Sequence, residues 1–425
     1  MKRTYRWLVG VGALAGVAAA AVYALNRLDE SPIEKSESVQ VTPALVAKGE
    51  YLSRAGNCMA CHTVPGGKAF AGGRAIETPF GIIYSTNLTP DARDGVGGWN
   101  SSEFWRAMHN GRAKDGRLLY PAFPYTSYTQ ITRADSDAIW AYLRSVPAVT
   151  QPNRDNALGF PFNTQAALAG WRALFFRPGT FEANTQQTAE WNRGAYLVQG
   201  LGHCAACHTP RNVLGAARDG DAFRGGLIPV QNWYAPALNS PQEAGVAHWP
   251  QEQVEQLLKV GTSQQGSVSG PMAEVVFRST QYLDDRDVRS MATYLRALPQ
   301  HQITPEKAPS PAASTMELGA KVYRQNCAEC HGERGQGESG AFPALAGNRA
   351  VTMQSPTNVV RMVLEGGYLP ATQGNPRPQG MPPFLHVLSD KEIAAVVTYI
   401  RNAWDNVAST LDASDVYRTR ERRGS

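Results

Sequence analysis

Charged side chains are sparse in this chain of 425 residues. Only 18% of its residues are Asp, Glu, Lys or Arg and the formal net charge is +5, so the charge gives no support to nucleic-acid binding. Motifs for phosphate binding and nucleophilic catalysis are lacking too: no G-x-G-x-x-G follows a strand-like run, and no nucleophile elbow occurs. These absences favour a protein without a substrate site of its own.

Cysteine is equally scarce. The chain has six cysteines, all within C-x-x-C-H motifs, so none remains for a disulfide framework or an iron–sulfur cluster. A structural zinc site would need a second Cys or His pair at ligand spacing, and a thioredoxin-like pair would not recur three times with His in the same place. The three motifs are Cys58–His62, Cys204–His208 and Cys327–His331.

C-x-x-C-H is the attachment signature of a c-type haem. Two thiols three positions apart can add to the two vinyl groups of one porphyrin, and the imidazole that follows binds the iron. The sequence therefore predicts three covalent haems c with His62, His208 and His331 as proximal ligands. The thioether bonds would come from Cys58, Cys61, Cys204, Cys207, Cys327 and Cys330.

One long hydrophobic run is present, and it lies at the N-terminus. A basic flank precedes the uncharged stretch from Trp7 to Asn26, which is close to the roughly 20 residues that cross a bilayer. Because secretory hydrophobic regions are shorter, residues 1–27 favour an uncleaved anchor over a signal peptide cleaved after Ala24. In both cases the rest of the chain is exported. We therefore expect it on the periplasmic side of the cell inner membrane, where haem c can be attached.

Each haem motif lies inside a repeat. A helical segment with a Gly and an aromatic residue precedes it, and a related loop follows it: Tyr84–Leu88, Tyr234–Asn239 and Phe342–Leu345. A short amphipathic helix then ends in Gly: Ser101–Gly111, Gln251–Gly261 and Asn358–Gly366. A longer helix with an acidic first turn closes each copy, at roughly Ala134–Val146, Asp285–Leu298 and Asp390–Trp404.

This plan is typical of a small class I cytochrome c domain. The predicted fold is therefore all-α, with three such domains in tandem after the N-terminal segment. The first and last helices of such a domain cross at close range, where a Gly lets the backbones approach and an aromatic fills the notch. The candidate pairs are Gly49 with Tyr142, Gly194 with Tyr294, and Gly319 with Tyr399.

Composition sets the domain boundaries. After the N-terminal segment we expect a polar tether over 28–43. The aromatic-rich connector over 149–190 should pack between the first two domains or present a docking surface, and 301–314 is a Pro/Ala-rich linker. The cytochrome domains then span 44–148, 191–300 and 315–407. The remaining 408–425 forms a basic tail, which we interpret as a solvated end rather than a lipid contact.

The sixth ligand of each iron influences its potential, and a thioether raises it. In the second copy, Met272 lies on a Gly/Pro loop eleven residues after Gly261. In the third copy, Met381 lies on such a loop before the closing helix. A Met on a Gly/Pro loop outside any helical stripe is seldom core packing, so both are predicted distal ligands.

The first copy departs from this pattern. Phe123 stands twelve residues after Gly111, where a Met is expected, and phenylalanine cannot bind iron. The nearest replacement donors are Met108 and His109 on the preceding helix. The first haem is therefore either five-coordinate or bound by one of these two residues, with Met108 slightly preferred. We expect its spectrum and potential to differ from those of the other two.

Longer motifs carry a family resemblance over roughly residues 45–405. They are TPFGIIYSTNLTPD, RLLYPAFPYTSY, GLGHCAACHTPRN and GPMAEVVFRSTQYL. With the three C-x-x-C-H domains, they resemble the cytochrome c subunit of bacterial membrane-bound dehydrogenases. These include quinohaemoprotein alcohol dehydrogenases and flavin-dependent gluconate, sorbitol and fructose dehydrogenases, and similar subunits accompany molybdenum hydroxylases.

The resemblance implies an electron-transfer subunit. A partner dehydrogenase, which is a quinoprotein, flavoprotein or molybdenum enzyme, would oxidise the substrate, and electrons would pass through the haems to membrane ubiquinone or a terminal oxidase. Family members often carry Met within the YPA-x-PY loop, so Phe123 is a departure. Two other functions stay open: a haem peroxidase or reductase acting at an open first haem, and a membrane anchor for a soluble dehydrogenase.

Overall fold

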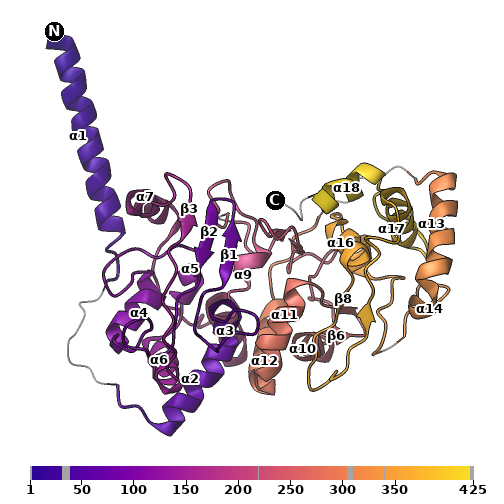
Figure 1. Cartoon of the computed structure of the whole chain (residues 1–425), viewed down its shortest axis with the longest axis horizontal. Helices are drawn as coiled ribbons and strands as arrows, with labels where there is room; N and C mark the ends of the chain where they lie inside the picture. Colours follow the sequence, from indigo (N-terminus) through magenta and orange to yellow (C-terminus); the bar gives the residue numbers. More distant parts are fainter. Residues whose placement is uncertain (1, 31–38, 219, 304–309, 339, 422–425) are drawn as a thin grey trace.

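A computed structural model of the chain describes residues 2–30, 39–218, 220–303, 310–338 and 340–421. Its long first helix, α1 (Lys2–Leu25), projects from one end of a largely helical body (Figure 1). The segment Tyr5–Leu25 has 21 residues and a mean hydropathy of 2.1, so it is long and apolar enough to cross a membrane.

Three pairs of helices organise the body. They are α2 (Pro43–Ala55) with α6 (Arg133–Ser145), α8 (Ala189–Tyr196) with α12 (Asp285–Arg296), and α13 (Ala313–Asn326) with α17 (Asp390–Asn402). We call the segments that they enclose unit 1 (43–145), unit 2 (189–296) and unit 3 (313–402). Each closing helix begins on a side chain that accepts a hydrogen bond from its first turn, namely Thr132, Asp284 or Ser389.

The predicted glycine crossings are confirmed. A Cβ built on Gly49 would lie 1.9 Å from the carbonyl oxygen of Ala138, and one on Gly194 would lie 1.9 Å from that of Ser290. In unit 3 the corresponding distance from Gly319 is 2.3 Å, to Ala395. These distances are far below van der Waals contact, so only Gly fits. The Cβ atoms of the predicted aromatic partners border the same glycines: Tyr142, Tyr294 and Tyr399.

A middle helix in each unit ends at the predicted glycine. The three helices are α4 (Ser101–Asn110), α10 (Gln251–Val260) and α16 (Thr357–Glu365). Gly111, Gly261 and Gly366 follow them with positive φ values of 58°, 84° and 65°. The shorter elements are α3 (Cys58–His62), α5 (Tyr125–Tyr128), α9 (Ala205–His208), α11 (Pro271–Arg278), α14 (Ala328–His331), α15 (Arg349–Thr352), the π-helical turn η1 (Leu197–Leu201) and the 3-10 turn η2 (Thr280–Tyr282).

The all-α prediction is too simple, because short strands are present. Where the sequence analysis predicted no secondary structure, β1 (Ala75–Thr78) pairs antiparallel with β2 (Gly81–Tyr84), and β3 (Ala157–Leu158) of the connector adds to β2. The β-branched residues Ile82 and Ile83 suit a strand. Two-residue pairs join β4 (Gly226–Leu227) to β5 (Tyr234–Ala235), β6 (Thr262–Ser263) to β7 (Gly266–Ser267), and β8 (Gly367–Tyr368) to β9 (Gly380–Met381).

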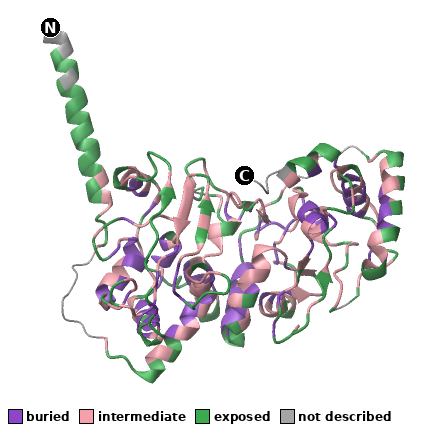
Figure 2. Cartoon of the chain, in the orientation of Figure 1, coloured by how far each residue is buried: buried purple, intermediate pink, exposed green. Residues whose placement is uncertain are grey.

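Units 1 and 2 share one hydrophobic core, whereas unit 3 has a core of its own. Figure 2 shows buried residues along the packed helices of the body, while α1 is almost wholly exposed. Two reciprocal hydrogen bonds also join the first two units: Tyr51 donates to Asp287 at 2.7 Å, and Tyr196 donates to Asp135 at 2.5 Å. Both tyrosines stand two residues after a crossing glycine, where unit 3 has Lys321.

The connector over 149–190 is ordered, as its aromatic content indicates. It contains β3 and a helix that the sequence analysis did not predict, α7 (Gln165–Phe175), and it buries Phe176. Of the polar tether over 28–43, residues 31–38 lie outside the described residues, but Leu28–Glu30 contact unit 1 rather than forming a free tether. Of the 301–314 linker, residues 304–309 lie outside the described residues, and α13 begins within its last part.

The C-terminal end differs from the expected solvated tail. Residues Ala413–Glu421 form α18, which packs against α16 and α17. Leu411 and Val416 are buried in the unit 3 core, and Arg420 pairs with Asp390 at 2.5 Å. Apolar burial and an ion pair thus hold this polar segment against the third unit. Residues 422–425 lie outside the described residues.

Candidate haem sites

Each C-x-x-C-H motif ends on a histidine whose ring is held by a backbone carbonyl. Nδ1 lies 2.7 Å from Thr86 O for His62, 2.7 Å from Pro236 O for His208, and 2.9 Å from Pro343 O for His331. Because a carbonyl only accepts, Nδ1 carries the proton and Nε2 keeps its lone pair. Burial lowers the pKa of all three imidazoles, which favours this neutral form. Metal-binding histidines are oriented in the same way.

The three carbonyls belong to the related loops that follow each motif. Sequence reasoning identified these loops but missed the glycines that bring them close. The N–H groups of Gly72, Gly225 and Gly337 donate to the carbonyls of His62, His208 and His331 at 2.8, 2.9 and 2.8 Å. The glycines have φ values of 75°, 74° and 64°. They stand ten, seventeen and six residues after their histidines, so comparison of the repeats at fixed spacing could not align them.

Each motif histidine ends a short helix, which begins at Cys58 in unit 1 and is preceded by Cys204 or Cys327 as the N-cap residue in units 2 and 3. In every motif the first cysteine is half-buried and the second is exposed, and all six thiols are free. Burial raises the pKa of Cys58 to about 11 and that of Cys204 to about 12. At neutral pH these sulfurs are therefore protonated thiols, the form that adds to a vinyl group with its proton.

This donor set fits a haem c better than a bare metal ion. Among the residues that the structure describes, no group of three or more His, Cys, Asp or Glu side chains is arranged to hold a metal ion. The sulfurs and the imidazole of one motif therefore do not converge on one point, as they would in a zinc site. A haem c needs this separation, because the sulfurs bind the porphyrin edge and the imidazole binds the iron.

The prediction that the two distal methionines lie on Gly/Pro loops is wrong, because Met272 belongs to a helix and Met381 to a short strand. Met272 stands in the first turn of α11, after Gly270 with a φ of 52°, and is half-buried. Met381 lies in β9 and packs against the unit 3 core. Their role as iron ligands stays a prediction.

In unit 1, Phe123, which stands at the sequence position where a methionine is expected, belongs to an aromatic cluster. The ring of Phe123 lies 5.4 Å from that of Tyr128, and Tyr128 donates to Gly56 O at 3.0 Å. Both ring nitrogens of His109 are engaged, Nδ1 with Thr129 O at 2.8 Å and Nε2 with Asp29 at 2.9 Å. His109 therefore has no nitrogen left for iron. Met108 is buried in the shared core.

The attachment segments of units 1 and 2 lie against each other. A Cβ on Gly56 would be 3.3 Å from Cys58 Sγ and 3.4 Å from Leu201 Cδ2. The rings of Tyr128 and His203 meet edge to face at 5.6 Å. This contact places the first and second attachment sites at one interface.

Arginines missed by the sequence analysis support two of the motifs. Arg74 donates to the carbonyl of Ala60, and Arg211 donates to that of Ala206 at 2.6 Å. Each carbonyl belongs to the residue before the second cysteine of a motif. The spacing of the two arginines from their motifs differs, so the repeat gave no signal for them.

Unit 3 contacts the histidine loop of unit 2. Asn358 Nδ2 donates to Tyr234 O at 2.7 Å, and Tyr234 N donates to Asn358 Oδ1 at 2.9 Å. Tyr234 stands two residues before Pro236, whose carbonyl holds His208. The guanidinium of Arg361 lies 4.7 Å from the ring centroid of Trp233 and strengthens this contact.

Comparison with known proteins gives consistent matches. The sequence model of the family described as cytochrome c matches residues 46–147 and 316–404. The chain is 39% identical to the cytochrome c subunit of the quinone-type alcohol dehydrogenase of Komagataeibacter europaeus, over 89% of this chain and 84% of the relative. It is 38% identical to the gluconate 2-dehydrogenase cytochrome c subunit of Pantoea cypripedii, over 89% of this chain and 90% of the relative.

A third relative is longer. The chain is 40% identical to a nicotinate dehydrogenase subunit of Pseudomonas putida, over 96% of this chain. It spans only 35% of that relative's length.

Proposed function

This chain belongs to the family of cytochrome c subunits of dehydrogenases, and on that premise we propose that it carries three covalent haems c. It passes electrons from a partner dehydrogenase to ubiquinone or a terminal oxidase. The observation that carries this proposal is the donor set present three times, with two free thiols beside an imidazole whose Nδ1 is held by a carbonyl. The names of the relatives support a dehydrogenase as the partner, which is a quinoprotein, flavoprotein or molybdenum enzyme.

The residues of each motif take distinct roles. The two cysteines bind the porphyrin edge, and Nε2 of His62, His208 or His331 binds the iron from the proximal side. Each bound haem supplies an iron that exchanges one electron between its ferrous and ferric states. The loop carbonyls fix the tautomer of each ring and raise its basicity as a ligand. Met272 and Met381 are the distal ligands in units 2 and 3.

The first haem differs from the others. Since both nitrogens of His109 are engaged, Met108 is the remaining donor on α4. Otherwise the iron is five-coordinate, with Phe123 in the place of the ligand.

We further propose that each unit is one class I cytochrome c domain. The domains correspond to 44–148, 191–300 and 315–407, and α18 packs on the third. α1 anchors the chain in the cell inner membrane, and the domains lie on the periplasmic side. The basic flank before the apolar run supports this orientation.

Intact mass spectrometry of the mature protein tests the haem count. Produced in a cell that matures cytochromes c, the polypeptide should carry the added mass of three haems, and a smaller addition would contradict the proposal. The same spectrum shows whether residues 1–24 remain, which separates a retained anchor from a signal peptide cleaved after Ala24.

Phe123 favours a second candidate function, a peroxidase or reductase activity at an open first haem. Carbon monoxide binding to one of the haems, together with turnover of peroxide, would support this function. Tight binding without turnover would leave electron transfer as the function of an open site. Substrate-dependent haem reduction in the complex with the dehydrogenase would show electron transfer. Its absence would favour a purely anchoring role.

A further inference from the structure

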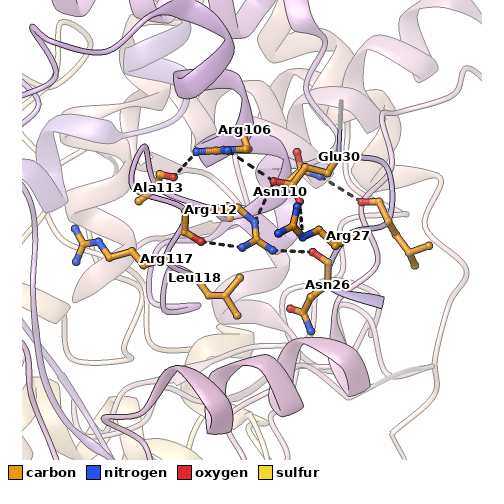
Figure 3. Close-up of polar contacts among 12 residues, drawn as sticks. Asn26, Arg27, Glu30, Arg106, Asn110, Arg112, Ala113, Arg117 and Leu118 are labelled. Carbon is orange, nitrogen blue, oxygen red and sulfur yellow. Dashed lines mark hydrogen bonds and ion pairs between the residues drawn. The ribbon is translucent and has the colours of Figure 1, made fainter. Parts of the chain in front are cut away.

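The C-terminal end of α1 is held against unit 1 by a polar network (Figure 3). Arg172 on α7, only 3% exposed, donates through Nε to Asn26 Oδ1 at 2.9 Å. The side chain of Asn26 donates to Ala169 O at 2.9 Å, and Arg112 donates to Asn26 O at 2.9 Å. The residue that follows the apolar helix is thus bound to both α4's C-terminal loop and α7.

Charged side chains extend the same junction. Glu30 lies 3.1 Å from Arg112 and 3.8 Å from Arg106, and all three side chains are only 11–12% exposed. Nearly buried ion pairs are costly to break, because each leaves an uncompensated charge. The direction in which α1 leaves unit 1 is therefore set by the fold.

Apolar side chains are exposed next to this junction. Phe160 and Phe162, just before α7, are 84% and 36% exposed, and Leu174 on α7 is 67% exposed. Val213 and Leu214 of unit 2 are 94% and 41% exposed. We call these five side chains the apolar face.

The apolar face is continuous across the two units. The ring of Phe162 lies 4.4 Å from that of Phe80, and a Cβ on Gly215 would be 3.1 Å from Phe80. Trp171 on α7 donates through its indole N–H to Leu214 O at 2.9 Å. Contacts thus run from Phe162 through Phe80 of unit 1 to the Leu214–Gly215 segment of unit 2, and from there to α7. α7 in turn packs against α1 (Figure 1).

We propose that the apolar face rests in the interface of the lipid bilayer that α1 crosses. This inference rests on the proposed membrane anchor. Since the junction fixes α1 to unit 1, the bilayer surface must lie where α1 ends, and α7 lies beside that end. Exposed Phe and Leu side chains beside Trp suit the apolar edge of a bilayer interface. Units 1 and 2 would then rest on the membrane together.

Site-specific labelling of the full chain in vesicles tests this inference. Because the six native cysteines are bound to haem in the mature protein, Phe160→Cys and Leu174→Cys each add one reactive thiol for an environment-sensitive dye. Tyr368→Cys in unit 3 is the matched control, since Tyr368 is 74% exposed and its strand β8 lies in the part of the body away from α1 (Figure 1). Nitroxide lipids of a phosphatidylcholine and phosphatidylglycerol vesicle and aqueous iodide serve as the two quenchers.

We expect nitroxide lipid to quench the dye at 160 and 174 severalfold more than at 368, and iodide to show the opposite order. If the protein floats with the vesicles but iodide reaches all three positions equally, the inference is wrong while the anchor stands. If the protein does not float with the vesicles, the proposed anchor itself fails. Protection from iodide without quenching by nitroxide lipid would mean that protein covers the face, which also overturns the inference.

Discussion

Nη1 of Arg74 in unit 1 lies 3.1 Å from Oε1 of Glu274 in unit 2. The same nitrogen donates to the carbonyl of Ala60, between the two cysteines of the first motif. Glu274 stands two residues after Met272, the predicted distal ligand of the second haem. This ion pair therefore links the first attachment site to the distal segment of the second.

Glu274→Gln should raise the potentials of the first two haems, because a nearby negative charge stabilises ferric iron. The two side chains are 33% and 38% exposed, so the interaction is that of a solvent-screened pair, and we expect shifts of roughly 10–40 mV. Arg74→Gln should lower the same potentials. In a spectroelectrochemical titration, the double variant should return close to the wild-type values. An equal shift of the third haem would contradict a local effect.

Gly194→Ala should destabilise unit 2 strongly. Its Cβ would lie 1.9 Å from Ser290 O, which is backbone and cannot rotate away, so α8 and α12 must separate at a cost of about 1–3 kcal/mol. Gly170→Ala on α7 is the control, because nothing lies within 4 Å of its added Cβ. We expect that variant to be neutral or slightly stabilised. Thermal unfolding of the holoprotein measures both, and similar midpoints for the two variants would contradict the close crossing.

The glycine crossings, the helix caps and the helices that open and close each unit could be predicted from the sequence, because each depends on local spacing or backbone sterics. The contact between units could not. Tyr51 and Tyr196 each bind an aspartate of the other unit, whereas unit 3 has Lys321 at the equivalent place in a similar helix. Which faces of the repeats meet depends on their packing, and the repeat pattern carries no signal of it.

The glycine contacts that hold the motif histidines also could not be predicted from the sequence. The same hydrogen bond, from a glycine N–H to the carbonyl of the motif histidine, is made by Gly72, Gly225 and Gly337. Because the three glycines stand at different separations from their histidines, a comparison of the repeats does not align them. In the same way, the contacts of Asn26–Glu30 with α4 and α7 join segments about 80 to 140 residues apart. The sequence placed Asn26 at the end of the apolar run and identified 28–43 only as a polar tether.

Met272→Leu and Met381→Leu should each remove the distal ligand of one haem. Loss of the thioether removes the absorption band of methionine-bound iron and lowers the potential of that haem, on the order of 0.1 V within the ~0.8 V that axial ligands span. Met291→Leu, a buried change on α12, is the control and should leave all three spectra intact. Met108→Leu tests the first haem: an unchanged spectrum would leave that iron five-coordinate.

Asp287 should make the junction of units 1 and 2 sensitive to acid. Burial alone would raise its pKa, but the Arg193 guanidinium and the Tyr51 hydroxyl hold the pKa below its ordinary value of 3.8. A lowered carboxyl pKa stabilises the fold above the ordinary pKa, and this contribution is lost as the pH falls below 3.8.

Asp287→Asn should therefore cost about 1–3 kcal/mol at neutral pH and progressively less in acid. Urea unfolding of the holoprotein at several pH values follows the difference from wild type. Asp285→Asn in the same helical turn is the control, since its side chain is 88% exposed and its loss should have little effect. A difference that stays constant down to strong acid would contradict the role of the charge.

Glu30→Gln should loosen the junction between α1 and unit 1. The substitution leaves the nearly buried guanidinium groups of Arg106 and Arg112 without their carboxylate, which should cost about 1–3 kcal/mol of local stability. Hydrogen exchange of α4 and α7 in detergent-solubilised protein should accelerate accordingly, while α17 in unit 3 stays unchanged. Arg27→Gln is the control. Arg27 also pairs with Glu30, but its side chain is 54% exposed, so its loss should have little effect. If both variants exchange like wild type, the network does not fix α1, and the inferred placement of the apolar face loses its support.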